Sequence, residues 1–95
     1  MAKQTKERLV VVLTEFKEIF CGWTNDTDGE RVSLRQARQA CYYSEGTHGL
    51  LGLAVEGPAE GSKIGPAADM EVRKPVNIIE CTPQAAEAWS TAKWA

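Results

Sequence analysis

The apolar positions of this chain fall into short runs separated by turn residues, a pattern typical of strands. Leu9–Leu13 is a continuous run of branched aliphatic residues, which predicts a strand buried on both faces. Near the other end, Met70–Arg73 and Val76–Cys81 predict two more strands joined at Lys74-Pro75. The sequence therefore predicts a sheet built from both ends of the chain.

One segment between these strands fits two structures. Four apolar residues recur at i, i+3, i+4 and i+7, the spacing of one helix face; they are Phe16, Ile19, Phe20 and Trp23. Thr14 would cap such a helix. A turn over Glu15–Glu18 followed by a strand over Ile19–Trp23 fits the same residues, so the pattern leaves both structures open.

Two helices are predicted elsewhere. Leu34, Ala37 and Cys41 share a helical face behind a Ser33 N-cap, which predicts a short internal helix over 34–41. Thr82 as N-cap, followed by Pro83 and the alanine-rich residues 84–90, predicts a C-terminal helix with Trp89 in the core. The predicted fold is α+β and β-dominated: a small antiparallel sheet or partly closed barrel with these two helices.

Length makes the core small. The 95 residues form one domain, 1–95, with residues 1–7 expected to be flexible. A domain of this size buries only roughly 60–65% of the surface that its unfolded chain exposes, and oligomerisation is a common supplement. Trp94, about 140° around the helix from Trp89 by the helical repeat, would dock into a neighbouring subunit or pack back on its own domain. We therefore expect a homo-oligomer.

Charge and cysteine content exclude several classes of function. The net charge of −2 argues against nucleic-acid binding through bulk electrostatics. The three cysteines lie far apart without a CxxC pair, which predicts reduced, buried thiols and no zinc site. The longest apolar run is too short for a signal peptide or a membrane span, so we expect a cytoplasmic protein without membrane contact.

Metal binding has one weak candidate. Residues 24–35 fit three positions of a calcium loop through Asp26, Asp28 and Gly29, but Thr24 and Arg35 occupy its first and last positions. The segment 25–29 is better explained as a solvated hairpin turn. We expect no metal and no cofactor.

The segment 45–66 holds six of the eight glycines and the only histidine. Its apolar residues are expected to be its buried part; they are Leu50, Leu51, Leu53 and Val55. It fails as a phosphate-binding loop because only three residues separate Gly57 from Gly61, Ser62 precedes Lys63, and Glu60 would repel phosphate. Structural turns are the favoured interpretation, and a contact loop is the alternative. One histidine, His48, supplies neither a triad nor a metal site, so no catalytic residue is predicted.

Arg31, Arg35 and Arg38 would share one face of the predicted internal helix, beside Tyr42 and Tyr43. A solvated charged face is the first interpretation, and stacking of a nucleotide or RNA base on the tyrosines is the alternative. The candidate ligand contacts of the whole chain are Arg38, Tyr42, Tyr43, His48, Ser62 and Lys63.

Several motifs occur together in a characteristic order: Val10-Val11-Val12, Phe20-Cys21-Gly22, Tyr42-Tyr43-Ser44, Gly49-Leu50-Leu51-Gly52-Leu53-Ala54, Gly61-Ser62-Lys63-Ile64-Gly65-Pro66 and Glu80-Cys81-Thr82-Pro83. In this combination the chain resembles a family of small uncharacterised proteins of tailed bacteriophages. The resemblance implies a phage protein acting in the host cytoplasm, without known activity or cofactor. It also favours a strand over Ile19–Trp23.

These observations lead us to expect a non-enzymatic, homo-oligomeric phage accessory protein that binds a host component or signal and counteracts host defence. A nucleotide-sequestering protein, using Arg38, the two tyrosines and residues 57–65, is the first alternative. An RNA-binding ring is the second. An enzyme is least favoured, because it would require His48 with Glu45 or Glu56.

Overall fold

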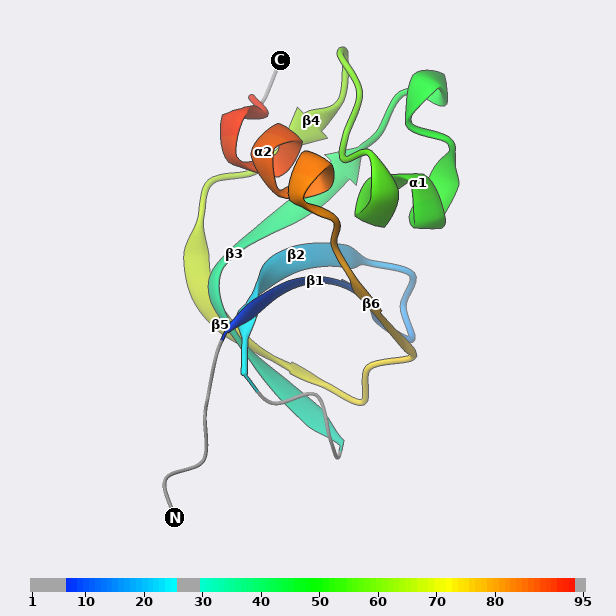
Figure 1. Ribbon diagram of the computed structural model, residues 1–95. Coiled ribbons are helices and arrows are strands. Elements are labelled where there is room, and N and C mark those ends of the chain that lie inside the picture. The colour runs from blue at the N-terminus through cyan, green and yellow to red at the C-terminus, as the bar shows by residue number, and fades with distance from the viewer. Residues whose placement is uncertain (1–6, 26–29, 94–95) are drawn as a thin grey trace.

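The computed structural model describes residues 7–25 and 30–93, which form a bent antiparallel sheet with helices over one face (Figure 1). The strand order is β4-β3-β2-β1-β6, and β5 also pairs with β3. The strands are β1 (Arg8–Leu13), β2 (Ile19–Thr24), β3 (Arg31–Tyr42), β4 (Lys63–Ile64), β5 (Ala68–Arg73) and β6 (Asn77–Glu80). The helices are η1 (Glu45–Thr47), α1 (Gly49–Val55) and α2 (Pro83–Thr91). The β-dominated α+β class is confirmed, and the sheet is not closed into a barrel.

β1 is buried on both faces, as its continuous apolar run predicts. Leu9 and Val11 belong to a cluster under the helices, which we call the helix-side cluster. Val10 and Val12 belong to a second cluster on the opposite face, the inner cluster, together with residues of β3 and β5. Because side chains alternate along a strand, one strand thus supplies both cores.

The segment Ile19–Trp23 is a strand, so the helical alternative is wrong. β2 pairs antiparallel with β1 along its whole length. Ile19 lies opposite Leu13, and Trp23 lies opposite Leu9. The connecting turn is fixed by Thr14, whose Oγ1 accepts hydrogen bonds from the amides of Phe16 and Glu18 at 3.3 and 3.1 Å.

The internal helix predicted over 34–41 is also wrong, because these residues lie within the 12-residue strand β3. β3 pairs with β2 along one edge and with β5 and β4 along the other. A bulge at Gln36, whose φ is 55°, inserts one residue and returns Ala37 to the face of Leu34. The i, i+3 spacing of Leu34 and Ala37, which suggested a helix, therefore results from the bulge in this strand.

The internal helix that the chain does form is α1, within the glycine-rich segment. Leu53 is fully buried and Leu50 packs against the helix-side cluster, as expected. Leu51 and Val55, which we expected to be buried, are 64% and 51% exposed. They lie one turn apart, so α1 has an apolar outer side.

α2 forms as predicted. The Thr82 hydroxyl accepts a hydrogen bond from the amide of Ala85 at 3.1 Å, and Pro83 begins the helix. Trp89 is 3% exposed, and its indole N–H donates to the carbonyl of Leu53 in α1 at 2.9 Å. This hydrogen bond joins the two helices above the sheet.

The cysteines differ from one another in burial. Cys21 is buried, and its Sγ lies 3.9 Å from Sγ of the half-buried Cys81, whereas Cys41 is exposed near the end of β3. The expectation of three buried thiols is therefore wrong for Cys41. The predictions for residues 1–6 of the flexible N-terminus, for Asp26, Asp28 and Gly29 and for Trp94 concern positions outside the described residues. None of the helices in the described part is both long and apolar enough to cross a membrane.

Candidate functional site

Arg38 extends from β3 across the helix-covered face and is half-buried. Its guanidinium donates to the carbonyls of Trp89 and Ala92 at 2.6 and 2.9 Å, and to those of Gly65 and Ile64 at 2.7 and 3.3 Å. These four contacts hold the end of α2 against the segment around β4. The hydrogen-bonding capacity that a phosphate would need is therefore already used by the backbone.

The other two arginines of the predicted basic face point to separate partners. Arg31 Nη1 lies 3.3 Å from a carboxylate oxygen of Glu71, and Arg35 Nη2 lies 2.6 Å from one of Glu7. Because β3 is a bulged strand and not a helix, the three arginines do not form one cationic face.

Ser62 is buried and belongs to a network that fixes the glycine-rich segment. Its Oγ accepts the amide hydrogen of Ser44 at 3.0 Å and lies 3.4 Å from Thr47 Oγ1, which accepts from the amide of Ala59 at 3.0 Å. Gly57 and Gly61 have φ values of 85° and 94°, which glycine adopts without strain. These contacts support the structural-turn interpretation of the segment.

The remaining candidates are dispersed. Tyr42 is exposed opposite Lys63 in the β3–β4 register, whereas Tyr43 packs against the helix-side cluster, so the two rings do not form one stacking surface. His48 Nδ1 lies 3.2 Å from Glu56 Oε1, with both side chains largely in solvent. The six predicted ligand contacts therefore do not converge on one site.

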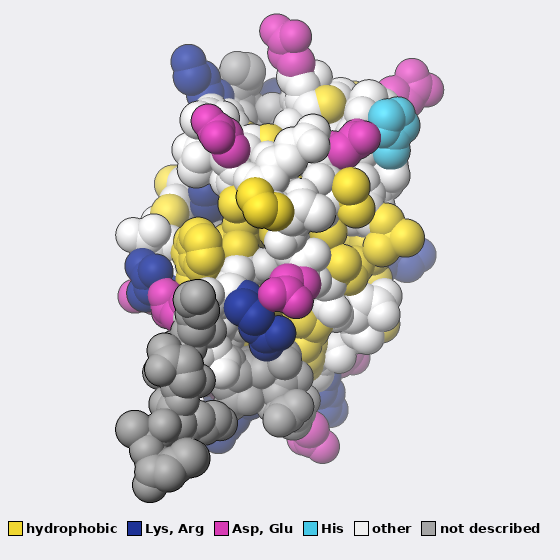
Figure 2. All heavy atoms as spheres, in the orientation of Figure 1, with side chains coloured by type: hydrophobic (Ala, Val, Ile, Leu, Met, Phe, Trp, Pro, Cys, Tyr) yellow, Lys and Arg dark blue, Asp and Glu magenta, His cyan; other side chains and the backbone are white. Residues whose placement is uncertain are grey.

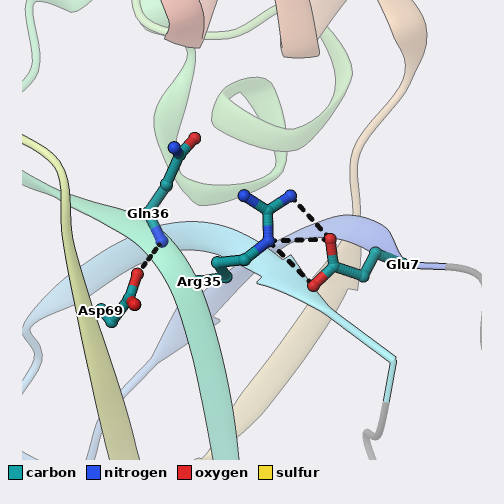
Figure 3. A network of polar contacts seen from close by, with 4 residues as sticks. All are labelled: Glu7, Arg35, Gln36 and Asp69. Carbon is teal, nitrogen blue, oxygen red and sulfur yellow. Dashed lines mark hydrogen bonds and ion pairs between the residues drawn. The ribbon is translucent and has the colours of Figure 1, made fainter.

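A different candidate site lies at the bulge in β3. The left-handed conformation of Gln36 is held by a hydrogen bond of 2.9 Å from its backbone N–H to Asp69 Oδ1 in β5 (Figure 3). On the opposite edge, the register between β2 and β3 shifts between Cys21 and Trp23. Sequence reasoning missed Gln36 because the bulge depends on pairing with β2 and β5.

Next to the bulge, Arg35 clamps Glu7. Arg35 Nε lies 2.9 and 3.0 Å from the two carboxylate oxygens, and Nη2 adds the shorter contact (Figure 3). The hydrogen bonds from Arg35 lower the pKa of Glu7, and the same contact raises the pKa of Arg35. Both groups are exposed, so solvent screens the pair, and its main effect is to tie the residue before β1 to β3 across the intervening strand β2.

A cavity of about 280 Å³ lies between α2 and the sheet. Its lining includes Leu9, Cys21, Trp23, Gln36, Arg38 and Trp89. Burial strongly raises the pKa of Cys21, which keeps this thiol neutral and makes it a poor nucleophile. We call this space the α2 cavity; its lining is suited to binding and offers no activated nucleophile among the residues named.

A second feature is an apolar surface along one side of the molecule. It comprises Leu51 and Val55 of α1, the outer edge of β6, and Val76, which is 55% exposed just before β6. Figure 2 shows hydrophobic side chains on this side, at the level of α1 and β6. Within the described residues β6 pairs only with β1, so its other edge is open. We call this the α1–β6 surface.

The fold and these two features define a small α+β domain in which one bent sheet is covered by helices on a single face. A model for a domain of unknown function, DUF6948, matches residues 7–89. The chain therefore belongs to the DUF6948 family. No curated protein and no solved structure matches the chain significantly.

Proposed function

We propose that this protein is a non-enzymatic, homo-oligomeric binding protein whose subunits associate through the α1–β6 surface. The observation that carries the proposal is the exposure of Leu51 and Val55, at 64% and 51%, on one side of a seven-residue helix. Burying a large aliphatic side chain contributes about 1.5–3 kcal/mol. A domain with a small core gains most from covering such residues.

The open edge of β6 is a second reason to place the subunit interface at the α1–β6 surface. An unpaired strand edge offers backbone donors and acceptors that readily pair with another strand. Here Val55 lies beside one end of β6, where the Thr82 amide donates to Ala54 O at 2.9 Å, and Val76 lies at the other end. Edge pairing and apolar contact would therefore act together, and a two-fold axis lets one surface serve both subunits.

The biological setting of the proposal rests on the resemblance to small proteins of tailed phages. On that basis the protein is a phage accessory protein of the host cytoplasm, which binds a host component or signal and counteracts host defence. Its assembly would leave the α2 side of each subunit available to the bound component. The nucleotide and RNA alternatives gain no support from Arg38, whose donors are occupied by backbone carbonyls.

Mass measurement by light scattering after size exclusion tests the assembly. At micromolar concentration we expect a multiple of the 10.4 kDa chain mass. The double variant Leu51→Glu/Val55→Lys should shift the mass to that of one chain. This pair keeps the net charge constant, and a Glu followed four residues later by a Lys supports the helix.

The matched control is Tyr42→Glu, which places a charge on a residue of similar exposure, 55%, on β3 beside the other edge strand, β4. This variant should keep the wild-type mass. A monomeric wild-type protein, or a double variant that remains assembled, would refute the proposed interface. Circular dichroism of all three proteins establishes that the fold is retained.

A further inference from the structure

We propose that the α2 cavity binds an uncharged, planar heteroaromatic molecule of nucleobase or nucleoside size. The first support is the backbone of Gln36. A non-glycine residue in the left-handed region is strained, and such strain persists where the surroundings fix it. Here Asp69 fixes it by accepting the Gln36 N–H at 2.9 Å.

The strained conformation determines where the Gln36 side chain points. Figure 3 shows its carboxamide directed away from Asp69 and toward the helices, and the residue lines the α2 cavity. The carboxamide makes no hydrogen bond to any other described residue. It therefore presents one donor group and one acceptor, the combination that hydrogen-bonds to the edge of a nucleobase.

Two tryptophans line the same space, and of these Trp23 has the more exposed ring. The Trp89 ring is locked because its N–H donates to Leu53 O at 2.9 Å. Trp23 is half-buried, and its indole N–H has no partner within ranges 7–25 and 30–93. A planar ring stacked against the Trp23 indole would lie beside the unpaired groups of Trp23 and Gln36, with the buried Trp89 forming the floor of the cavity.

The volume of the cavity and the charges around it further limit the class of ligand. A volume of about 280 Å³ is at the lower end for small-molecule pockets, which favours a base or nucleoside. The Arg38 guanidinium is engaged with carbonyls, and the adjoining hollow beyond Trp23 is lined by Glu7, Asp69 and Glu71. These carboxylates disfavour a phosphate, so an uncharged ligand fits better than a nucleotide or RNA. Exposed lining residues, among them Gln36 and Ser90, give the cavity access to solvent.

Equilibrium dialysis with adenosine, guanosine, cytidine and uridine tests the site, and tryptophan fluorescence provides a second readout. We expect at least one nucleoside to bind saturably with one site per chain, and its monophosphate to bind more weakly. Gln36→Gly should lower the affinity at least about tenfold, the loss of roughly one hydrogen bond. Glycine accepts the left-handed conformation, so this variant keeps the bulge and removes the whole side chain with its carboxamide.

Gln36→Asn is the matched control, since it retains a carboxamide and tolerates the same backbone conformation; it should bind more tightly than Gln36→Gly. Three results would overturn the proposal: no nucleoside binding at millimolar concentration, equal affinity of the wild-type and Gln36→Gly proteins, or indole binding as well as every nucleoside. The site lies within one subunit. Binding by Leu51→Glu/Val55→Lys should therefore match the wild type, which separates this proposal from the one on assembly.

Discussion

Arg38 joins the last helix to the sheet through hydrogen bonds to backbone carbonyls. It lies over the helix-covered face of β3 and satisfies carbonyls at the end of α2, where the helix leaves its last carbonyls without internal partners. A cation at a helix C-terminus also interacts favourably with the helix dipole. The residue therefore contributes to the stability of the whole domain.

We expect Arg38→Met to lower the free energy of unfolding by about 2–4 kcal/mol, because half-buried carbonyls lose charged donors. Arg38→Lys should recover part of this loss, since an ammonium group has three donors in a less suitable geometry. Urea unfolding followed by circular dichroism provides the measurement. The control is Arg31→Met, which removes an exposed ion pair and should cost less than about 1 kcal/mol. Equal losses in the two methionine variants would contradict this role for Arg38.

At the scale of single residues, the sequence predicts which side chains are distinctive and leaves their partners undetermined. Arg38 and Ser62 were selected as ligand contacts, yet both bind the protein's own backbone. The sequence does not show whether a side chain will bind the backbone or a ligand, so it cannot distinguish a structural arginine from a ligand-binding one. Thr82 was predicted correctly because its N-cap partner lies only three residues away.

Among the elements, β3 and the α1–α2 contact determine the shape of the candidate sites. The β3 bulge positions Gln36 at the α2 cavity. Gly57, just after α1, has a φ of 85°, and a Cβ there would lie 2.4 Å from the Ala88 Cβ of α2. The two helices can approach this closely only with glycine at that position.

Gly57→Ala should therefore destabilise the domain by more than about 2 kcal/mol, the sum of a left-handed alanine and a steric clash. Gly49→Ala is the matched comparison. Its φ is 78°, but no atom lies within 4 Å of the added Cβ, so only the backbone term of about 1 kcal/mol applies. Thermal unfolding of the two variants measures the difference. If they lose the same stability, the close contact with α2 is not important.

The elements also show where sequence patterns succeed. β1, β5, β6 and α2 were all predicted within a few residues, because each has a local apolar run or a capping motif. For β2 the apolar pattern left helix and strand open, and only the family resemblance favoured the strand. The segment 34–41 was assigned wrongly because a bulge gives a strand the i, i+3 spacing of a helix. α1 was missed because its glycines, Gly49 and Gly52, are poor helix formers. Gly52 is required by packing: an added Cβ would lie 1.8 Å from the carbonyl oxygen of Thr47.

The described part of the molecule is organised around β1; among its strands, β1 alone contributes fully buried valines to both clusters. It lies between β2 and β6 in the sheet, and α1 and α2 cover its outer side chains. The two cores therefore cannot open independently of this strand.

Hydrogen exchange should show this organisation. We expect the amides of Val10, Val11 and Val12 to exchange slowest, through global unfolding, because opening them requires both clusters to separate. Amides of α1 should exchange earlier, since one side of that helix is exposed. Native-state exchange followed by NMR or mass spectrometry resolves the two regions. Protection in α1 equal to that of β1 would show that the domain opens as one unit.

The central place of β1 has a consequence for biosynthesis. The ribosome makes β1 about 70 residues before its neighbour β6 and its cover α2. Until they leave the ribosome, Leu9–Leu13 is an uncovered aliphatic strand of the kind that chaperones bind and that aggregates. Folding of this domain must therefore wait until β6 and α2 have left the ribosome, and its yield in the cell should depend on how well the nascent chain is protected during that interval.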